Sequence, residues 1–185
     1  IRKAVGPDIV LRVDANQGWT PKEAVKIIGQ LEDRGADIEL VEQPVHYSDI
    51  SGMQYVTSQT YTNILADESV FSPKQAIEVI EKRAADLINI KLMKTGGISK
   101  AQQINSIAEA NGVECMIGCM LETKISVSAA AHFAAANKNV TMVDLDGPSL
   151  CVKDPIDGGP FFEGESIQMS DDSGIGFLIE AFIAK

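Results

Sequence analysis

Three acidic residues and one lysine recur in this sequence at intervals of 28, 25 and 24 residues: Asp14, Glu42, Asp67 and Lys91. Each of them ends a short apolar run, as in DIVLRVD, DIELVE, NILAD and DLINIK. Three carboxylates that meet at one place repel each other unless a cation joins them, and a hard divalent cation with oxygen ligands does this well. The alternative is that each acid only caps the helix that follows it. The repeated spacing favours a site for Mg²⁺, or for Mn²⁺ in its place, with Lys91 beside it.

The elements that position these residues alternate along the chain. Apolar runs typical of strands lie at 8–16, 37–44, 63–69, 86–97, 113–120 and 139–148. Amphipathic segments typical of helices lie at 20–35, 49–60, 72–84, 99–112 and 124–137. Repeats of this kind predict an α/β protein with a parallel sheet and helices outside it. Because parallel strands end at one edge, the acids and Lys91 are expected to point into one mouth.

Two architectures remain open at this point, an open doubly wound sheet and a (β/α) barrel. No glycine-rich phosphate loop follows the first strand, which weakens the nucleotide-binding version of the open sheet. A complete TIM-type barrel needs eight strands and typically ~250 residues, so six strands predict an incomplete barrel. We expect a partial barrel domain over 1–150 and a C-terminal segment of loops and short strands over 151–185.

Composition excludes several functions. The net charge of −10 argues against binding nucleic acid. No apolar run reaches the ~18 residues of a membrane span, and the first residues do not resemble a signal peptide. The chain has three cysteines without a CxxC pair, and neither His46 nor His132 lies at ligand spacing from them. These features predict a cytoplasmic protein without a disulfide framework or a zinc site.

The order of the motifs VDAN, VEQP, ADES and KLMKTGG resembles the enolase superfamily, in its muconate-lactonizing-enzyme subgroup. The resemblance implies that Asp14, Glu42 and Asp67 are metal ligands and that Lys91 holds the catalytic position of a KxxKxGG motif. The later DLDGP is similar to the DxD motif of the dipeptide epimerases, which act on L-Ala-D/L-Glu. The implied activity is an isomerase that epimerises a dipeptide by removing its α-proton through an enediolate.

One departure from the family pattern matters. The family carries a KxK motif that supplies a second catalytic lysine, and an N-terminal capping domain, and neither is in this sequence. The chain would then correspond to strands three to eight of the barrel, with 151–185 packing toward the cap. We expect the chain to form a homo-oligomer or to pair with the missing N-terminal half.

The residues around Lys91 suggest how it would act. A neighbouring cation lowers the pKa of a lysine, so a neutral Lys91 could serve as a base near pH 7. Lys94 is expected to act electrostatically or to have a purely structural role. Asn16 and Glu68 are candidates for residues that contact and support the metal ligands.

A second group of residues is expected to bind the substrate. Asp144 and Asp146 are two residues apart, so on a strand they would share a face and suit the α-ammonium group of a dipeptide. The alternative is a turn before Gly147. Cys119 and Met120, in the segment GCMLET, are expected to line the pocket and contact the substrate backbone.

Two further alternatives stay open. The same base and metal would serve a cycloisomerase, an o-succinylbenzoate synthase or an N-acylamino acid racemase, although these substrates lack the positive charge that the DxD pair suits. The chain could also be an inactive fragment of such an enzyme. A six-stranded sheet has two open edges that invite association, so the isolated chain is expected to be poorly active.

Overall fold

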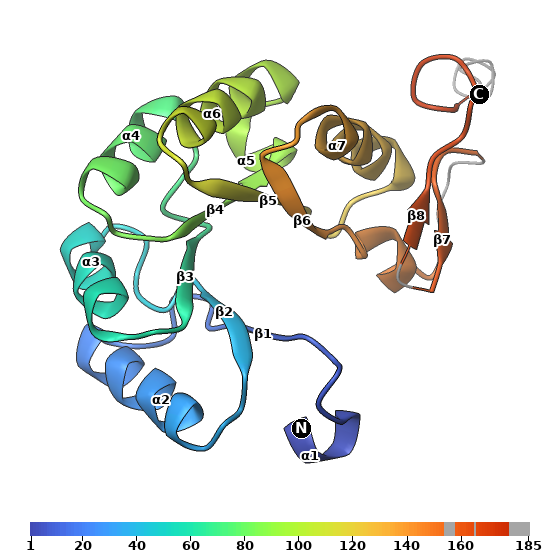
Figure 1. Cartoon of the computed structure of the whole chain (residues 1–185). Helices are drawn as coiled ribbons and strands as arrows, with labels where there is room; N and C mark the ends of the chain where they lie inside the picture. The colour runs from blue at the N-terminus through green and yellow to red at the C-terminus, as the bar shows by residue number, and fades with distance from the viewer. Residues whose placement is uncertain (154–157, 165, 178–185) are drawn as a thin grey trace.

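The computed structural model describes residues 1–153, 158–164 and 166–177. Its main sheet is built from six parallel strands in chain order: β1 (Leu11–Asp14), β2 (Ile38–Glu42), β3 (Asn63–Ala66), β4 (Leu87–Lys91), β5 (Glu114–Gly118) and β6 (Val140–Asp144). The sheet curves into an arc with its helices on the outer side (Figure 1). The prediction of an incomplete barrel is confirmed. The doubly wound alternative is wrong, because the strand order never reverses.

Helices follow each of the first five strands, as predicted. The helices are α1 (Arg2–Val5), α2 (Pro21–Asp33), α3 (Ile50–Gln59), α4 (Pro73–Glu81), α5 (Leu92–Thr95), α6 (Ile98–Ala110) and α7 (Lys124–Ala136). Local sequence explains where the predicted helices α2 and α4 begin. The side chain of Thr20 accepts a hydrogen bond from the backbone N–H of Glu23, and the Glu23 carboxylate accepts one from the backbone N–H of Thr20. Ser72 caps α4 by accepting a hydrogen bond from the backbone N–H of Gln75. Both helices have proline at the first position, where no N–H partner is needed.

Apolar side chains form two layers, one on each face of the sheet. The larger layer lies between the strands and the outer helices and includes Ile28, Ile64, Ile88, Ile104 and Ile117. A smaller layer lies on the concave face and consists of Leu40, Leu65, Leu87 and Met116, with the partly buried Met142 against them. The smaller layer is the packed interior of the barrel, below the mouth where the site is predicted.

All six strands end earlier than the sequence predicted, and β4 and β6 differ most from the prediction. β4 stops at Lys91, and the next four residues form the short helix α5 in place of more strand. Gly96 (φ +80°) and Gly97 (φ +114°) then turn the chain sharply into α6, in a backbone region that favours glycine. β6 stops at Asp144, and a 3-10 helix, η1 (Gly147–Leu150), follows.

The C-terminal part forms a small hairpin of its own, with β7 (Phe161–Glu163) antiparallel to β8 (Ser166–Gln168). Phe162 and Ile167 of the hairpin pack against the main core, and Ser128 of α7 donates a hydrogen bond to the carbonyl of Ile175 (2.8 Å). Parts of the predicted segment 151–185, namely 154–157, 165 and 178–185, lie outside the described residues. The division at residue 150 and the packing toward a capping domain stay predictions.

Two other findings bear on the sequence analysis. Within the described ranges, the helices are all too short or too polar to cross a membrane. Cys115, Cys119 and Cys151 are free thiols. Burial raises the pKa of Cys115 to about 12, so this thiol is an inert part of the core.

Candidate active site

The predicted site residues lie directly above the inner apolar layer. That layer is formed, strand by strand, by Leu40, Leu65, Leu87, Met116 and Met142. Two residues further along the chain come, in the same order, Glu42, Asp67, Asn89, Gly118 and Asp144. Because strand side chains alternate between faces, a step of two keeps the same face. These residues therefore face the inside of the barrel at or near the carboxyl ends of its strands.

The acids and Lys91 lie close together. Asp14 pairs in register with Glu42 across β1 and β2. The Lys91 Nζ lies 2.7 Å from Asp67 Oδ2 and 4.0 Å from Glu42 Oε1. Asn89 donates a hydrogen bond to Glu42 Oε1 (2.8 Å) from two residues before Lys91. The structure thus brings together the three acids and the lysine that the spacing predicted.

Lys94 lies in α5, directly after the strand that ends at Lys91, and its side chain contacts Asp67. Its Nζ forms an ion pair with Asp67 and donates to the carbonyls of Asp67 (2.6 Å) and Asn89 (3.0 Å). The ammonium also lies 5.5 Å from the centre of the Phe71 ring. Burial lowers the pKa of Lys94, although the charge of Asp67 opposes this. The two lysines therefore hold different carboxylate oxygens of Asp67: Lys94 pairs with Oδ1, and Lys91 pairs with Oδ2.

Burial and neighbouring charges shift the pKa of Glu42 and of Lys91. Burial, together with the charges of Asp67 and Asp14, raises the pKa of Glu42 to about 7, although the hydrogen bond from Asn89 opposes the shift. Burial by itself lowers the pKa of Lys91, but the ion pair with Asp67 and the charge of Glu42 outweigh it and raise the pKa. These side chains by themselves therefore raise the pKa of Lys91, whereas the sequence predicted that a neighbouring cation would lower it.

The donor set has the chemistry of a magnesium site. It offers carboxylate oxygens from three neighbouring strands, which are the ligands that Mg²⁺ prefers. Burial raises the pKa of Glu42, and the charges of Asp67 and Asp14 add to the rise, so a cation bound among these acids would favour the ionised form of Glu42. Within residues 1–153, 158–164 and 166–177, no three His, Cys, Asp or Glu side chains already converge on a single point as a metal cage. The side chains match Mg²⁺ in charge and ligand type, whereas their positions do not form a closed cage among the described residues.

Asp144 and Asp146 are arranged differently from the prediction. Asp144 ends β6 in register with Gly118, whereas Asp146 has helical backbone angles and begins η1. The prediction that the two share a face of one strand is therefore wrong. The two side chains still interact. Partial burial is the main cause of the raised pKa of Asp144, and the charge of Asp146 is the second cause. Both carboxylates are exposed at the mouth of the site.

Cys119 and Met120 follow β5 and lie in the loop that leads to α7. The backbone N–H of Cys119 donates to the Asp144 carbonyl (3.1 Å), which ties the loop to β6. The backbone N–H of Met120 donates to the buried carboxylate of Glu122 (2.8 Å), and the Met120 side chain is exposed. Their positions leave both residues at the rim, and their contact with substrate stays a prediction.

Asn16 and Glu68 stand close to the acids in different ways. The backbone N–H of Asn16, in a left-handed conformation (φ +43°), donates to Asp14 Oδ1 (2.8 Å). Glu68 accepts a hydrogen bond from Gln17 (3.0 Å) through one carboxylate oxygen. Asn16 therefore orients a predicted ligand through its backbone, whereas Glu68 links two loops at the mouth.

Sequence reasoning missed three residues that shape the site: Gln43, Asn89 and Gly118. Asn89 is a polar residue in an otherwise apolar strand and two residues before Lys91, a signal that could have been recognised. Gly118 makes room for the Lys91 side chain, because a Cβ there would lie 2.8 Å from the Asn89 side chain and 3.0 Å from Lys91 Cε. Gln43 is fully buried next to Glu42, and only the structure shows its partners.

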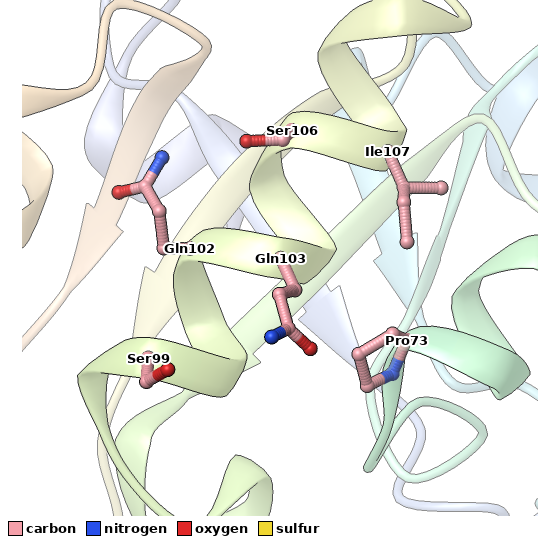
Figure 2. A pocket seen from close by; sticks show the side chains of 6 residues that line it. All are labelled: Pro73, Ser99, Gln102, Gln103, Ser106 and Ile107. Atoms are coloured by element: carbon pink, nitrogen blue, oxygen red, sulfur yellow. The ribbon is translucent and has the colours of Figure 1, made fainter.

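A separate hollow of about 570 Å³ lies on the outer helix layer. Its lining comes from the start of α4 and from one face of α6: Pro73, Ser99, Gln102, Gln103, Ser106 and Ile107 (Figure 2). None of these residues belongs to the concave face that carries the acids. The hollow is thus independent of the candidate active site.

A parallel strand arc with acids and a lysine at its carboxyl edge defines part of a (β/α) barrel, with charged residues on the face where barrel enzymes have their active sites. The chain belongs to the mandelate racemase and muconate lactonizing group of the enolase superfamily. The family model described as "Enolase C-terminal domain-like" matches residues 1–182.

Individual relatives show which members of the family this chain resembles. The chain is 55% identical to the L-Ala-D/L-Glu epimerase of Bacillus subtilis over 99% of its own length and 50% of the relative's length. A substrate-liganded structure of that epimerase superposes with a TM-score of 0.94 over 96% of this chain and 50% of the other. The dipeptide epimerase of Enterococcus faecalis, complexed with Mg and L-Leu-L-Tyr, gives a TM-score of 0.91 at 53% identity, over 95% and 50% of the two chains. The chain thus spans about half the length of these relatives.

Proposed function

We propose that this chain supplies the metal and base half of a dipeptide epimerase that acts on substrates such as L-Ala-D/L-Glu. The observation that carries the proposal is the position of Lys91, whose Nζ lies 2.7 Å from Asp67 and 4.0 Å from Glu42 at the barrel mouth. Similarity to epimerases over nearly the whole chain supports it.

In this proposal Asp14, Glu42 and Asp67 hold Mg²⁺, or Mn²⁺ in its place. The bound ion would neutralise the acids, lower the pKa of Lys91 and stabilise the negative charge that develops on the substrate carboxylate. Lys91 removes the α-proton from one face of the substrate, and Lys94 keeps Asp67 in place. Inversion also needs an acid on the opposite face, which the resemblance assigns to the KxK motif that this sequence does not contain.

The pair Asp144 and Asp146 would bind the α-ammonium group of the dipeptide. Both carboxylates are exposed at the same mouth, and the charge of Asp146 disfavours the ionised form of Asp144 until a cation binds. Asp146→Asn should raise the KM for Ala-Glu by about tenfold, since a hydrogen bond to a charged group contributes about 1.5–3 kcal/mol. An unchanged KM would remove the ammonium role and favour an N-acylated substrate instead.

The proposal is tested by deuterium exchange in the full-length gene product. With Mg²⁺ and D₂O, Lys91→Ala should abolish α-proton exchange from one of the two substrates L-Ala-L-Glu and L-Ala-D-Glu. Lys100→Ala is the matched control, because Lys100 is exposed on α6 and should leave exchange unchanged. Undiminished exchange from both substrates in Lys91→Ala would overturn the assignment.

A further inference from the structure

Gln43 is a buried amide whose hydrogen-bonding capacity is filled. Its Oε1 accepts from the backbone N–H groups of Asp67 (2.9 Å) and Ser69 (3.2 Å). Its Nε2 donates to the carbonyl of Val45 (3.0 Å) and to Ser69 Oγ (2.9 Å). A carboxamide has two donor hydrogens and one oxygen with two lone pairs, so four partners are its maximum. The side chain is fully shielded from solvent, so solvent cannot replace any of these bonds.

The main chain of Gln43 continues the sheet beyond the end of its regular pairing. The last register pair between β2 and β3 is Glu42 with Leu65. One residue later, the N–H of Gln43 donates to the Leu65 carbonyl (2.9 Å), and its own carbonyl accepts from the N–H of Gln17 (2.8 Å). Gln43 therefore connects the ends of the three strands that carry the predicted metal ligands.

The backbone of Gln43 is held in an unfavourable conformation. Its φ is +35°, in a region that residues with side chains rarely occupy. Such a conformation persists only where the surroundings determine it strongly, and it is frequent at functional sites. The four side-chain bonds and the two main-chain bonds of Gln43 provide that support.

We propose that Gln43 is a positioning residue that fixes Asp67 beside Glu42 and thereby sets the affinity of the site for a divalent cation. The inference rests on the proposed function and extends it to a residue outside the ligand set. The carboxylates of Glu42 and Asp67 repel each other, and the hydrogen bond that the Asp67 N–H donates to Gln43 Oε1 holds the two strand ends together. Without it, a cation would have to draw the ligands together at the expense of its binding free energy.

The test is a direct titration of Mn²⁺, with free Mn²⁺ followed by its electron paramagnetic resonance signal, on the folded full-length gene product. Gln43→Ala should weaken the Kd by about tenfold or more, the usual effect of losing a partner behind the ligands. The matched control is Asn105→Ala. Asn105 is also a buried amide (1% exposed), and it donates to Asn137 (3.2 Å) in the helix layer away from the acids. Its loss should lower the melting temperature but leave the Kd within twofold.

Gln43→Met is the second variant, because methionine keeps the volume and removes only the hydrogen bonds. Weaker Mn²⁺ binding in both folded variants supports the proposal, and binding within twofold of the wild type overturns it. If neither variant folds, Gln43 serves the fold as a whole, which also overturns it. If the wild-type protein does not bind Mn²⁺, the metal site of the proposed function fails, and this inference fails with it.

Discussion

Replacing Lys94 with methionine removes one of the two cations that hold Asp67. Both partners of this ion pair are buried, with 5% of the Lys94 side chain and 6% of the Asp67 side chain exposed. Methionine keeps most of the aliphatic stem, so the change removes charge and hydrogen bonds more than volume. Lys94→Met therefore isolates the electrostatic role of this lysine.

The expected loss of stability follows from the burial of the pair. Removing one partner of a buried ion pair costs about 3–5 kcal/mol, because the other charge stays buried without compensation. Lys91 still contacts Asp67 at 2.7 Å, so we expect the lower end, about 3 kcal/mol. The measurement is the free energy of unfolding in urea. The matched control is Lys82→Met, which breaks an exposed pair with Glu78 and should cost at most about 0.5 kcal/mol.

A double variant separates charge from packing. Asp67→Asn removes the carboxylate that both lysines hold, so the double variant Lys94→Met/Asp67→Asn loses the Lys94–Asp67 pair and also the partner of Lys91. Because the Lys94–Asp67 pair can be lost only once, the double variant should lose less stability than the sum of the two single variants. A loss below about 1 kcal/mol in Lys94→Met, or single losses that simply add in the double variant, would refute the reasoning.

Three further predictions concern other parts of the molecule. Gly118→Ala should lower kcat more than it lowers stability, because the new Cβ would lie 3.0 Å from Lys91 Cε and 2.8 Å from Asn89; proton exchange rates and melting curves together measure this. Cys115 should resist iodoacetamide in the folded protein between pH 8 and 10 and react after unfolding, as mass spectrometry of labelled peptides would show, because its pKa is raised to about 12. The same shift contributes stability below the ordinary thiol pKa of about 9 that is lost as the pH rises toward 12, and labelling of the folded protein at pH 8 would contradict the burial. Thr20→Ala should cost about 1 kcal/mol in urea unfolding by removing the capping box of α2, and an unchanged midpoint would contradict that role.

Much of the fold was predictable because it depends on local patterns. Apolar runs about 25 residues apart indicated the strands, and proline after Thr20 or Ser72 indicated where helices begin. The positions of Asp14, Glu42, Asp67 and Lys91 at strand ends followed from the same period. The predicted strand was too long after Lys91, because alternating apolar residues do not show where a chain leaves the sheet.

The residues that support the site were harder to predict. Gln43 acts through groups 24 and 26 residues away in the chain, Asp67 and Ser69, and a glutamine after an acidic residue gives no sign of such partners. Gly118 matters only because β5 lies beside β4 at that register. The shared strand face predicted for Asp144 and Asp146 failed because β6 ends between them.

The sequence by itself determined the order of the elements, the family and the set of acids and lysines, because these depend on residue type and on spacing along the chain. Only the tertiary structure decided which charged groups pair with each other. It placed both Lys91 and Lys94 on Asp67, left Glu42 with a raised pKa, and closed the polar contacts of Gln43 behind the ligands. The physical reason is that burial and distance set electrostatic interactions, and both arise only when strands that are distant in sequence pack side by side.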